Sequence, residues 1–213
     1  MNVFVSVGST ANPAHETFVK AVEDRLRAEG LTPLTVGRNY FTSDSPFIGV
    51  NKLMDDCRGV VVIALERIHV ESATEKRGSA AEGKLRDVKL ATPWNQIEAT
   101  LAYSRKLPLL VLVEQGVRQD GLLEQGFDWY VLNTPLEPAA LATSEFNGVL
   151  ASWTRKLSSA PAVRAPAAGP ASPADMTVGQ LLGALKPAQL WSVLGALAAA
   201  FAATFALGGK LFH

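Results

Sequence analysis

The sequence predicts an α/β protein with a parallel β-sheet covered by helices on both faces, followed by a C-terminal transmembrane helix. Residues 3–157 alternate strand-like and helix-like segments, a pattern that indicates a parallel sheet. Residues 59–64 form an uninterrupted apolar run, which is typical of a strand buried on both faces. Residues 190–207 carry no charge, and a run of about 18 residues is near the length that crosses a hydrocarbon core.

The first half of the domain is predicted to hold three strands and two helices. In chain order these are a strand at 2–7, a helix at 13–29, a strand at 31–36, a helix at 46–57 and a strand at 59–64. The first helix has apolar residues at helical spacing at Phe18, Val22 and Leu26, and Gly30 is a typical helix stop. Alternation of this kind places successive strands in one sheet.

The second half continues the same pattern after a long charged insertion. A helix is predicted to begin near Pro93, followed by a strand at 107–113, a strand at 127–132 and a helix at 138–156. Proline is tolerated in the first turn of a helix, and the preceding Thr92 is a typical cap for that turn. The domain therefore contains five predicted strands.

The insertion at 66–91 breaks the alternation and is rich in charge. Its charged residues include Arg67, Glu71, Glu75, Lys76, Arg77, Glu82, Lys84, Arg86, Asp87 and Lys89. Structureless connections longer than about 15 residues are uncommon in compact domains and are often lids or binding loops. Two interpretations stay open: a mobile solvated excursion, or a lid over the neighbouring site.

The chain is predicted to divide into three parts. Residues 1–157 form the α/β domain, and residues 158–176 form an Ala/Pro-rich linker that cannot bury a core. Residues 177–213 hold a short amphipathic element and then the membrane anchor at 190–207, which Trp191 and Lys210 flank as interfacial residues. A buried helix of this length is the alternative interpretation of the anchor.

The N-terminus runs directly into a strand without a signal peptide, so we expect a single-pass protein of the cell membrane with a cytoplasmic domain. Gly195 and Ala199 give a small-xxx-small spacing, which would allow homo-oligomers to form through this helix.

Composition excludes several classes of function. Twenty basic and twenty acidic residues cancel, and without a basic run a nucleic acid is not expected as a partner. The three histidines lie far apart without ligand spacing, so no metal site is predicted. Cys57 is the single cysteine and is expected to be a small core residue.

Glu98 is the strongest candidate for a catalytic residue. In the helix that begins near Pro93, Trp94, Ile97, Glu98 and Leu101 share one face, which is otherwise apolar and predicted to be buried. A carboxylate on such a face is costly unless something uses it. The alternatives are that Glu98 is a capped or paired surface carboxylate and that Trp94 is an ordinary core residue.

Further candidate residues lie at the same edge of the predicted sheet. Ligands of open parallel sheets bind beyond the carboxyl ends of the strands, and there Gly8 and Ser9 follow the first strand and Arg67 follows the third. Gly8 would let the backbone approach a ligand, Ser9 offers a hydroxyl, and Arg67 could hold a phosphate. A simple turn at Gly8 and Ser9, and a solvated arginine, are the alternatives.

The arrangement resembles the Toll/interleukin-1 receptor (TIR) domain and its relative, the nucleoside 2-deoxyribosyltransferase-like fold, both flavodoxin-like five-stranded sheets. The residues that carry this resemblance are 3–9, 48–64 and 93–99, with Ala102 and the strand after Leu107. In catalytic members a glutamate on the helix after the third strand serves cleavage of an N-glycosidic bond, and Glu98 is the matching position. The acidic residues expected before the glycine-threonine of true deoxyribosyltransferases are missing, which argues against base exchange.

The resemblance implies a membrane-anchored hydrolase that cleaves the N-glycosidic bond of NAD or a related nucleotide, acting in bacterial antiviral defence. NAD would be the substrate and not a cofactor, with Trp94 against its base or ring. The alternative function is a non-catalytic nucleotide-sensing or assembly module that acts through its membrane segment.

Overall fold

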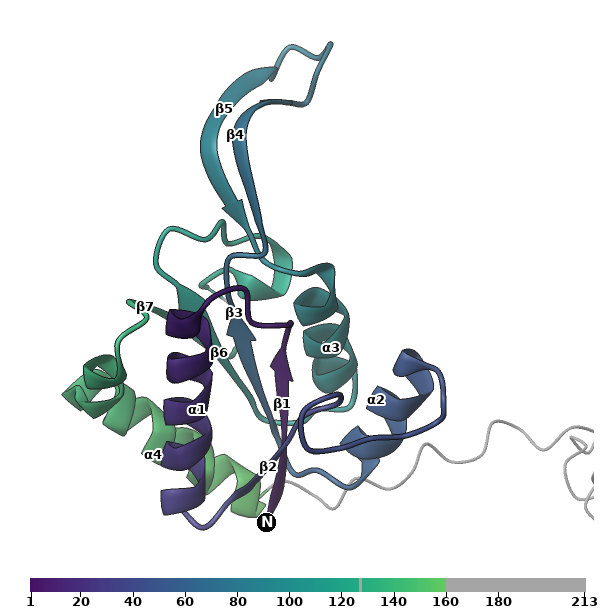
Figure 1. The fold of residues 1–213 in the computed structure, drawn as a ribbon, viewed down its shortest axis with the longest axis vertical. Helices are drawn as coiled ribbons and strands as arrows, with labels where there is room; N and C mark the ends of the chain where they lie inside the picture. Colours follow the sequence, from purple (N-terminus) through teal and green to yellow (C-terminus); the bar gives the residue numbers. More distant parts are fainter. Residues whose placement is uncertain (127, 160–213) are drawn as a thin grey trace, which may run out of the picture. The chain divides into compact units, whose positions relative to one another are not determined.

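A five-stranded parallel β-sheet is the centre of the fold in the computed structural model, which describes residues 1–126 and 128–159 (Figure 1). The strand order is β2-β1-β3-β6-β7, and all four pairings are parallel. The strands are β1 (Asn2–Val7), β2 (Thr32–Leu34), β3 (Val60–Ala64), β6 (Leu109–Glu114) and β7 (Tyr130–Thr134). The predicted five-stranded parallel sheet is therefore confirmed.

Four α-helices and two short 3₁₀ helices connect these strands. They are α1 (Pro13–Ala28), α2 (Pro46–Asp55), α3 (Pro93–Ser104), η1 (Gly121–Leu123), η2 (Pro138–Ala142) and α4 (Ser144–Ser159). The Asn12 side chain accepts the His15 amide at 2.9 Å, and the Thr92 hydroxyl accepts the Trp94 amide at 3.4 Å. Both helices have proline at their first position, so the predicted start of α3 is confirmed.

The two faces of the sheet bury different sets of side chains because side chains alternate along each strand. Helices α1 and α4 cover one face, and α2 and α3 cover the other (Figure 1). The first face includes Val3, Val5, Val61, Ile63, Leu110 and Leu112, and the second includes Phe4, Val60, Val62, Val111 and Val113. Cys57 belongs to the second core, and burial raises the pKa of its thiol to about 12. It is thus the small core residue that the sequence predicted.

Helix α3 packs on the sheet through a different stripe from the one predicted. Its buried residues are Asn95, Glu98, Ala99 and Ala102. Trp94 and Ile97 are each 39 % exposed, so the prediction that they share the buried face with Glu98 was wrong. Small alanine side chains fill this stripe instead, and alanine lets a helix approach a sheet closely.

The charged insertion is an ordered antiparallel hairpin. Strands β4 (Ile68–Glu75) and β5 (Gly83–Leu90) pair from Ile68 opposite Leu90 to Glu75 opposite Gly83. The hairpin projects beyond the edge at which the central strands end (Figure 1). Backbone hydrogen bonds hold its base, from Arg67 N to Leu90 O and from Arg118 N to Lys89 O, each 2.8 Å long. The expectation that this segment lacks secondary structure was therefore wrong, and its role as a lid stays a prediction.

The remaining differences concern the end of the domain. Strand β7 begins at Tyr130, later than predicted, and the predicted helix at 138–156 divides into η2 and α4. Helix α4 runs to Ser159, so the first two residues of the predicted linker are helical. The rest of the linker, the amphipathic element and the predicted anchor lie outside the described residues. Within residues 1–126 and 128–159, no helix has both the length and the apolarity needed to cross a membrane.

Gly59, at the entry to β3, allows α4 to pack against the sheet. A Cβ atom at Gly59 would lie 2.2 Å from Leu157 Cδ2 and 3.1 Å from both Pro108 O and Trp153 Cζ2. We expect Gly59→Ala to lower the free energy of unfolding by about 1 to 3 kcal/mol, because the added methyl group would overpack the core between β3 and α4. Urea denaturation would measure this loss. The control is Gly83→Ala in the hairpin, where a Cβ meets nothing within 4 Å. Equal stability of the two variants would contradict the packing argument.

Candidate functional site

The candidate site is a cavity at the point where the strand order of the sheet reverses. Strand β1 leads into α1 on one face, whereas the chain after β3 leads through the hairpin to α3 on the other face. The crevice beyond the carboxyl ends of two such strands is the usual ligand site of open α/β sheets. A cavity of about 280 Å³ lies there, lined by Val7, Gly8, Ser9, Val36, Pro46, Val50, Arg67, Thr92, Trp94 and Glu98. It brings together all five residues that the sequence proposed for the site: Gly8, Ser9, Arg67, Trp94 and Glu98.

Glu98 is a buried carboxyl group at the wall of this cavity. It is 9 % exposed, and burial raises its pKa to about 7, against a smaller lowering by a hydrogen bond with the Ser6 side chain. Glu98 forms no ion pair with any described residue, so the interpretation as a paired surface carboxylate was wrong. At neutral pH the group therefore divides between its ionised and protonated forms.

Ser6, in β1, and Asn95, three residues before Glu98 in α3, form a buried polar contact that sequence reasoning missed. The Asn95 Nδ2 atom donates to Ser6 Oγ at 3.0 Å, and it also lies 3.4 Å from the carbonyl oxygens of Ser6 and Ile63. Ser6 is 0 % exposed and Asn95 is 1 % exposed. The signals in the sequence were a serine inside an apolar strand and an amide three residues before Glu98.

Arg67 and Ser9 meet at the mouth of the cavity. Arg67 Nη1 donates to Ser9 Oγ at 2.9 Å, which joins the exit of β1 to the base of the hairpin. Among residues 1–126 and 128–159, no carboxylate lies within ion-pair distance of Arg67, and its side chain is exposed. A guanidinium group without a paired anion can bind a phosphate bidentately.

Gly8 and Trp94 form other parts of the wall. A Cβ atom at Gly8 would lie 3.0 Å from Thr92 Cγ2, so glycine lets the exit of β1 pass close to the start of α3. Trp94 lies one helical turn before Glu98 and lines the cavity. Because its ring is partly exposed, the interpretation of Trp94 as a core residue was wrong.

Two polar clusters hold the loops around this edge of the sheet. The Thr10 hydroxyl donates to Glu16 at 2.9 Å, and Arg38 pairs with Glu16 at 2.6 Å and thereby lowers the pKa of that carboxyl to about 2. At the end of β6, Glu114 Oε2 accepts the Glu66 amide at 2.6 Å and lies 3.4 Å from His15 Nε2. These contacts fix the exits of β1 and β3. No cluster of three or more histidine, cysteine or acidic side chains suited to a metal occurs in the described part of the chain.

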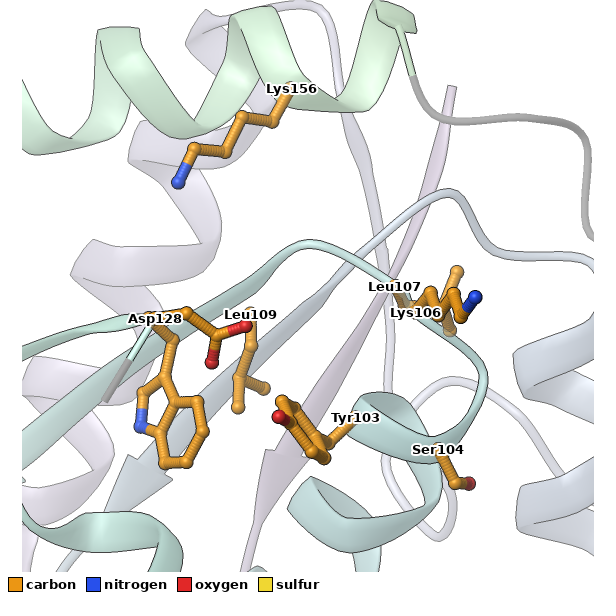
Figure 2. Close-up of a pocket in the computed structure, with 8 residues that line it drawn as sticks. Tyr103, Ser104, Lys106, Leu107, Leu109, Asp128 and Lys156 are labelled. Carbon is orange, nitrogen blue, oxygen red and sulfur yellow. The ribbon is translucent and has the colours of Figure 1, made fainter.

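A larger cavity, of about 580 Å³, lies at the opposite edge of the sheet (Figure 2). Its walls come from the end of α3, the start of β6 and α4, and include the aromatic pair Tyr103 and Trp129, whose ring centroids are 5.2 Å apart. The Lys156 side chain extends toward the space beside Asp128, whereas Lys106 points away. All three of these charged side chains are exposed, and the cavity is remote from the carboxyl ends of the strands. It therefore lacks the buried carboxyl group that distinguishes the site at Glu98.

The sheet has the flavodoxin-like strand order, and the site places a buried carboxyl group at the switch point between β1 and β3. Together these two features define the class of α/β protein. No protein-family model matches the chain, and no curated protein matches it.

Two similar solved structures are the CMP N-glycosidase BcmB of Clostridium botulinum and the TIR domains of the activated Roq1 resistosome that recognises the pathogen effector XopQ. BcmB is 14 % identical with a TM-score of 0.31, over 54 % of this chain and 72 % of that one. The TIR domains are 15 % identical with a TM-score of 0.35, over 75 % of this chain and 82 % of that one. At these scores neither likeness carries an argument, so the fold assignment rests on strand order and connectivity.

Proposed function

We propose that this protein is a hydrolase of the N-glycosidic bond of NAD or a related nucleotide, with Glu98 as its catalytic carboxylate. The observation that carries the proposal is a buried carboxyl group with a pKa of about 7 in the wall of a switch-point cavity. Cleavage of a ribosyl bond develops an oxocarbenium-like centre, which a carboxylate stabilises or captures.

The reaction balances without any further reagent. In NAD the bond between the ribosyl carbon and the positively charged nicotinamide breaks, and the bonding pair leaves with nicotinamide as a neutral base. The ionised Glu98 carboxylate faces the positive charge that then develops on the ribose. Water adds its oxygen to the ribosyl carbon and releases one proton to solvent. The ionised form of Glu98 is therefore the active one.

The other residues of the cavity supply contacts for a nucleotide. Trp94 offers a partly exposed ring for a base, and the Arg67 guanidinium has no paired anion among the described residues. Gly8 has no side chain, so the exit of β1 can lie close to Thr92 in the wall of the cavity. Together these groups suit a ligand with a ring, a ribose and a phosphate.

Arg67→Ala is expected to lower kcat/KM for NAD by about 10- to 100-fold, mainly through KM, because a charged hydrogen bond contributes about 1.5 to 3 kcal/mol. Nicotinamide riboside has no phosphate, so its hydrolysis should change little. Release of nicotinamide from both substrates, followed by chromatography, measures the difference. Arg77→Ala, in the exposed turn of the hairpin, is the matched control. Equal losses for the two substrates would remove Arg67 from phosphate binding.

The direct test of the proposal is incubation of the full chain, and of a forced oligomer of it, with NAD. Appearance of nicotinamide together with ADP-ribose supports a hydrolase. Binding of NAD without release of nicotinamide under both conditions contradicts the proposal and favours the non-catalytic sensor or assembly module.

The proposal also includes a single membrane anchor at 190–207, a cytoplasmic domain and homo-oligomers, supported by the uncharged run and the small residues within it. A lysine at the centre of such a segment costs about 2.5 to 3.5 kcal/mol of insertion free energy. We therefore expect Phe201→Lys to move the protein from the carbonate-washed membrane fraction to the supernatant, while Ala200→Leu stays with the membrane. Wild-type protein in the supernatant would contradict the anchor.

A role in bacterial antiviral defence completes the proposal and is motivated by the resemblance of the sequence to TIR domains at residues 3–9, 48–64 and 93–99. Plaque counts on a bacterial host that expresses the wild type or Glu98→Gln would test it. Protection that is equal in the two strains would separate any defence role from Glu98.

A further inference from the structure

We propose that the cavity beside Tyr103 and Trp129 is a second ligand site, which binds a free aromatic α-amino acid. This cavity and the one at Glu98 have no lining residue in common. Its volume of about 580 Å³ is typical of small-molecule sites, which range from about 300 to 1,000 Å³. The inference goes beyond the proposed hydrolysis of NAD and does not depend on it.

Apolar side chains form the inner wall of this cavity. Leu107 and Leu109, at the start of β6, are buried, and Trp129 is 9 % exposed. The Trp129 Nε1 atom donates to Leu122 O at 3.1 Å, which holds the orientation of the indole ring. Tyr103 meets this ring edge-on and is 50 % exposed. The ring of a ligand can pack against such a pair in the same edge-to-face or offset geometry.

Two opposite charges lie at the mouth of the cavity. The Lys156 side chain, from α4, extends toward the space beside Asp128, which precedes β7 (Figure 2). Neither side chain forms an ion pair or a hydrogen bond with any residue in the described part of the chain. An ammonium group and a carboxylate that face one space without pairing are each available to the opposite charge of a ligand.

This arrangement of charges favours one class of ligand. A free α-amino acid carries an ammonium group and a carboxylate on one carbon, so it can face Asp128 and Lys156 together while its ring packs on the aromatic pair. A nucleotide would bring its phosphates beside the Asp128 carboxylate, and like charges at short range repel each other. The end of a peptide carries only one of the two charges. The cavity therefore suits a zwitterion with a ring.

Isothermal titration calorimetry of the full chain with L-phenylalanine tests the proposal. The wild type should bind L-phenylalanine, and L-alanine should bind at least about 10-fold more weakly because it lacks the ring. Tyr103→Ala should weaken the binding of L-phenylalanine by about 3- to 10-fold, whereas Tyr103→Phe should bind it like the wild type. Absence of binding with both L-phenylalanine and L-tryptophan at about 10 mM would overturn the proposal.

Charge-deleted ligands assign the two charged side chains. Lys156→Gln should weaken the binding of L-phenylalanine by about 3- to 10-fold, since a charged contact at an exposed position contributes modestly. The same variant should bind L-phenylalaninamide, which lacks the carboxylate, as the wild type does. Asp128→Asn should weaken L-phenylalanine and L-phenylalaninamide alike. It should leave the affinity for N-acetyl-L-phenylalanine unchanged, because that ligand has no ammonium group.

The matched control is Lys106→Gln. Lys106 lines the same cavity, but its side chain points away from it, so the affinity for L-phenylalanine should not change. Equal weakening of L-phenylalanine and L-phenylalaninamide in Lys156→Gln would overturn the proposed contact of Lys156 with the carboxylate. Binding of NAD that weakens in both Lys156→Gln and Tyr103→Ala would make this cavity a nucleotide site and overturn the proposal.

Glu98→Gln separates this inference from the proposed function. Because Glu98 lines the other cavity, this variant should bind L-phenylalanine with the affinity of the wild type. That result is expected whether or not NAD is hydrolysed. Loss of L-phenylalanine binding in Glu98→Gln would place the amino acid in the cavity at Glu98 and overturn the second site.

Discussion

Glu98→Gln is expected to lower kcat for the release of nicotinamide from NAD by about three orders of magnitude. Glutamine keeps the shape of the side chain but removes the negative charge that would stabilise the oxocarbenium-like centre. The buried position of Glu98 strengthens that effect, because a charge in a site with little water interacts more strongly than one in solvent. Chromatography of nicotinamide after incubation with saturating NAD measures the loss.

The control for this variant is Glu114→Gln. Glu114 is buried at the end of β6, and a glutamine oxygen can still accept the Glu66 amide. We expect this variant to retain most of the activity, and circular dichroism would establish that both variants fold. Equal turnover in the wild type and Glu98→Gln would remove Glu98 from the mechanism.

Glu98→Gln is also expected to stabilise the fold at alkaline pH. In the folded protein the pKa of Glu98 is raised from 4.5 to about 7, so the folded state holds the proton more tightly than the unfolded state. The wild type therefore loses stability as pH rises from 4.5 through 7, by about 3 kcal/mol in total. Glutamine does not titrate, so the variant should exceed the wild type by about this amount at pH 8.

The stability difference should shrink below pH 7 and level off below pH 4.5, where Glu98 is protonated in both states. Urea denaturation of the full chain at pH 5, 6, 7 and 8 measures it, since the two proteins differ only at position 98. Glu124→Gln, which removes an exposed carboxyl group, is the control variant. A difference that stays constant across this pH range would contradict the raised pKa.

The candidate site therefore lowers the stability of the folded protein. A buried carboxyl group and the unsatisfied Asn95 oxygen lie on one stripe of α3, where apolar side chains of similar size would be more stable. Natural proteins commonly accept such a cost where function requires it. The expected gain in stability and loss of activity in Glu98→Gln are two results of the same carboxyl group.

The sheet and the start of α3 were predictable because local chemistry determines them. The apolar run of β3 is compatible only with burial on both faces, and Thr92 with Pro93 marks a helix start. Parallel strands end at one edge, so the sequence could also place Ser9, Arg67 and Glu98 near one another. The roles of these residues stay predictions.

The hairpin and the contact between Ser6 and Asn95 were not predictable in this way. In β5 charged side chains occupy both faces, Lys84 and Arg86 on one and Asp87 and Lys89 on the other, which hides the alternation that usually indicates a strand. Backbone bonds between distant residues hold the hairpin base. The buried stripe of α3 depends on how closely Ala99 and Ala102 approach the sheet, so the apolar pattern alone favoured Trp94 wrongly. The contact of Asn95 with Ser6 joins residues 89 positions apart.

The most direct test of the account is a crystal structure of Glu98→Gln with NAD bound. We predict that the ribosyl carbon bonded to nicotinamide lies against the side chain at position 98, with a phosphate on Arg67 and a ring beside Trp94. NAD bound instead in the cavity beside Tyr103, or with its ribose remote from position 98, would contradict the account.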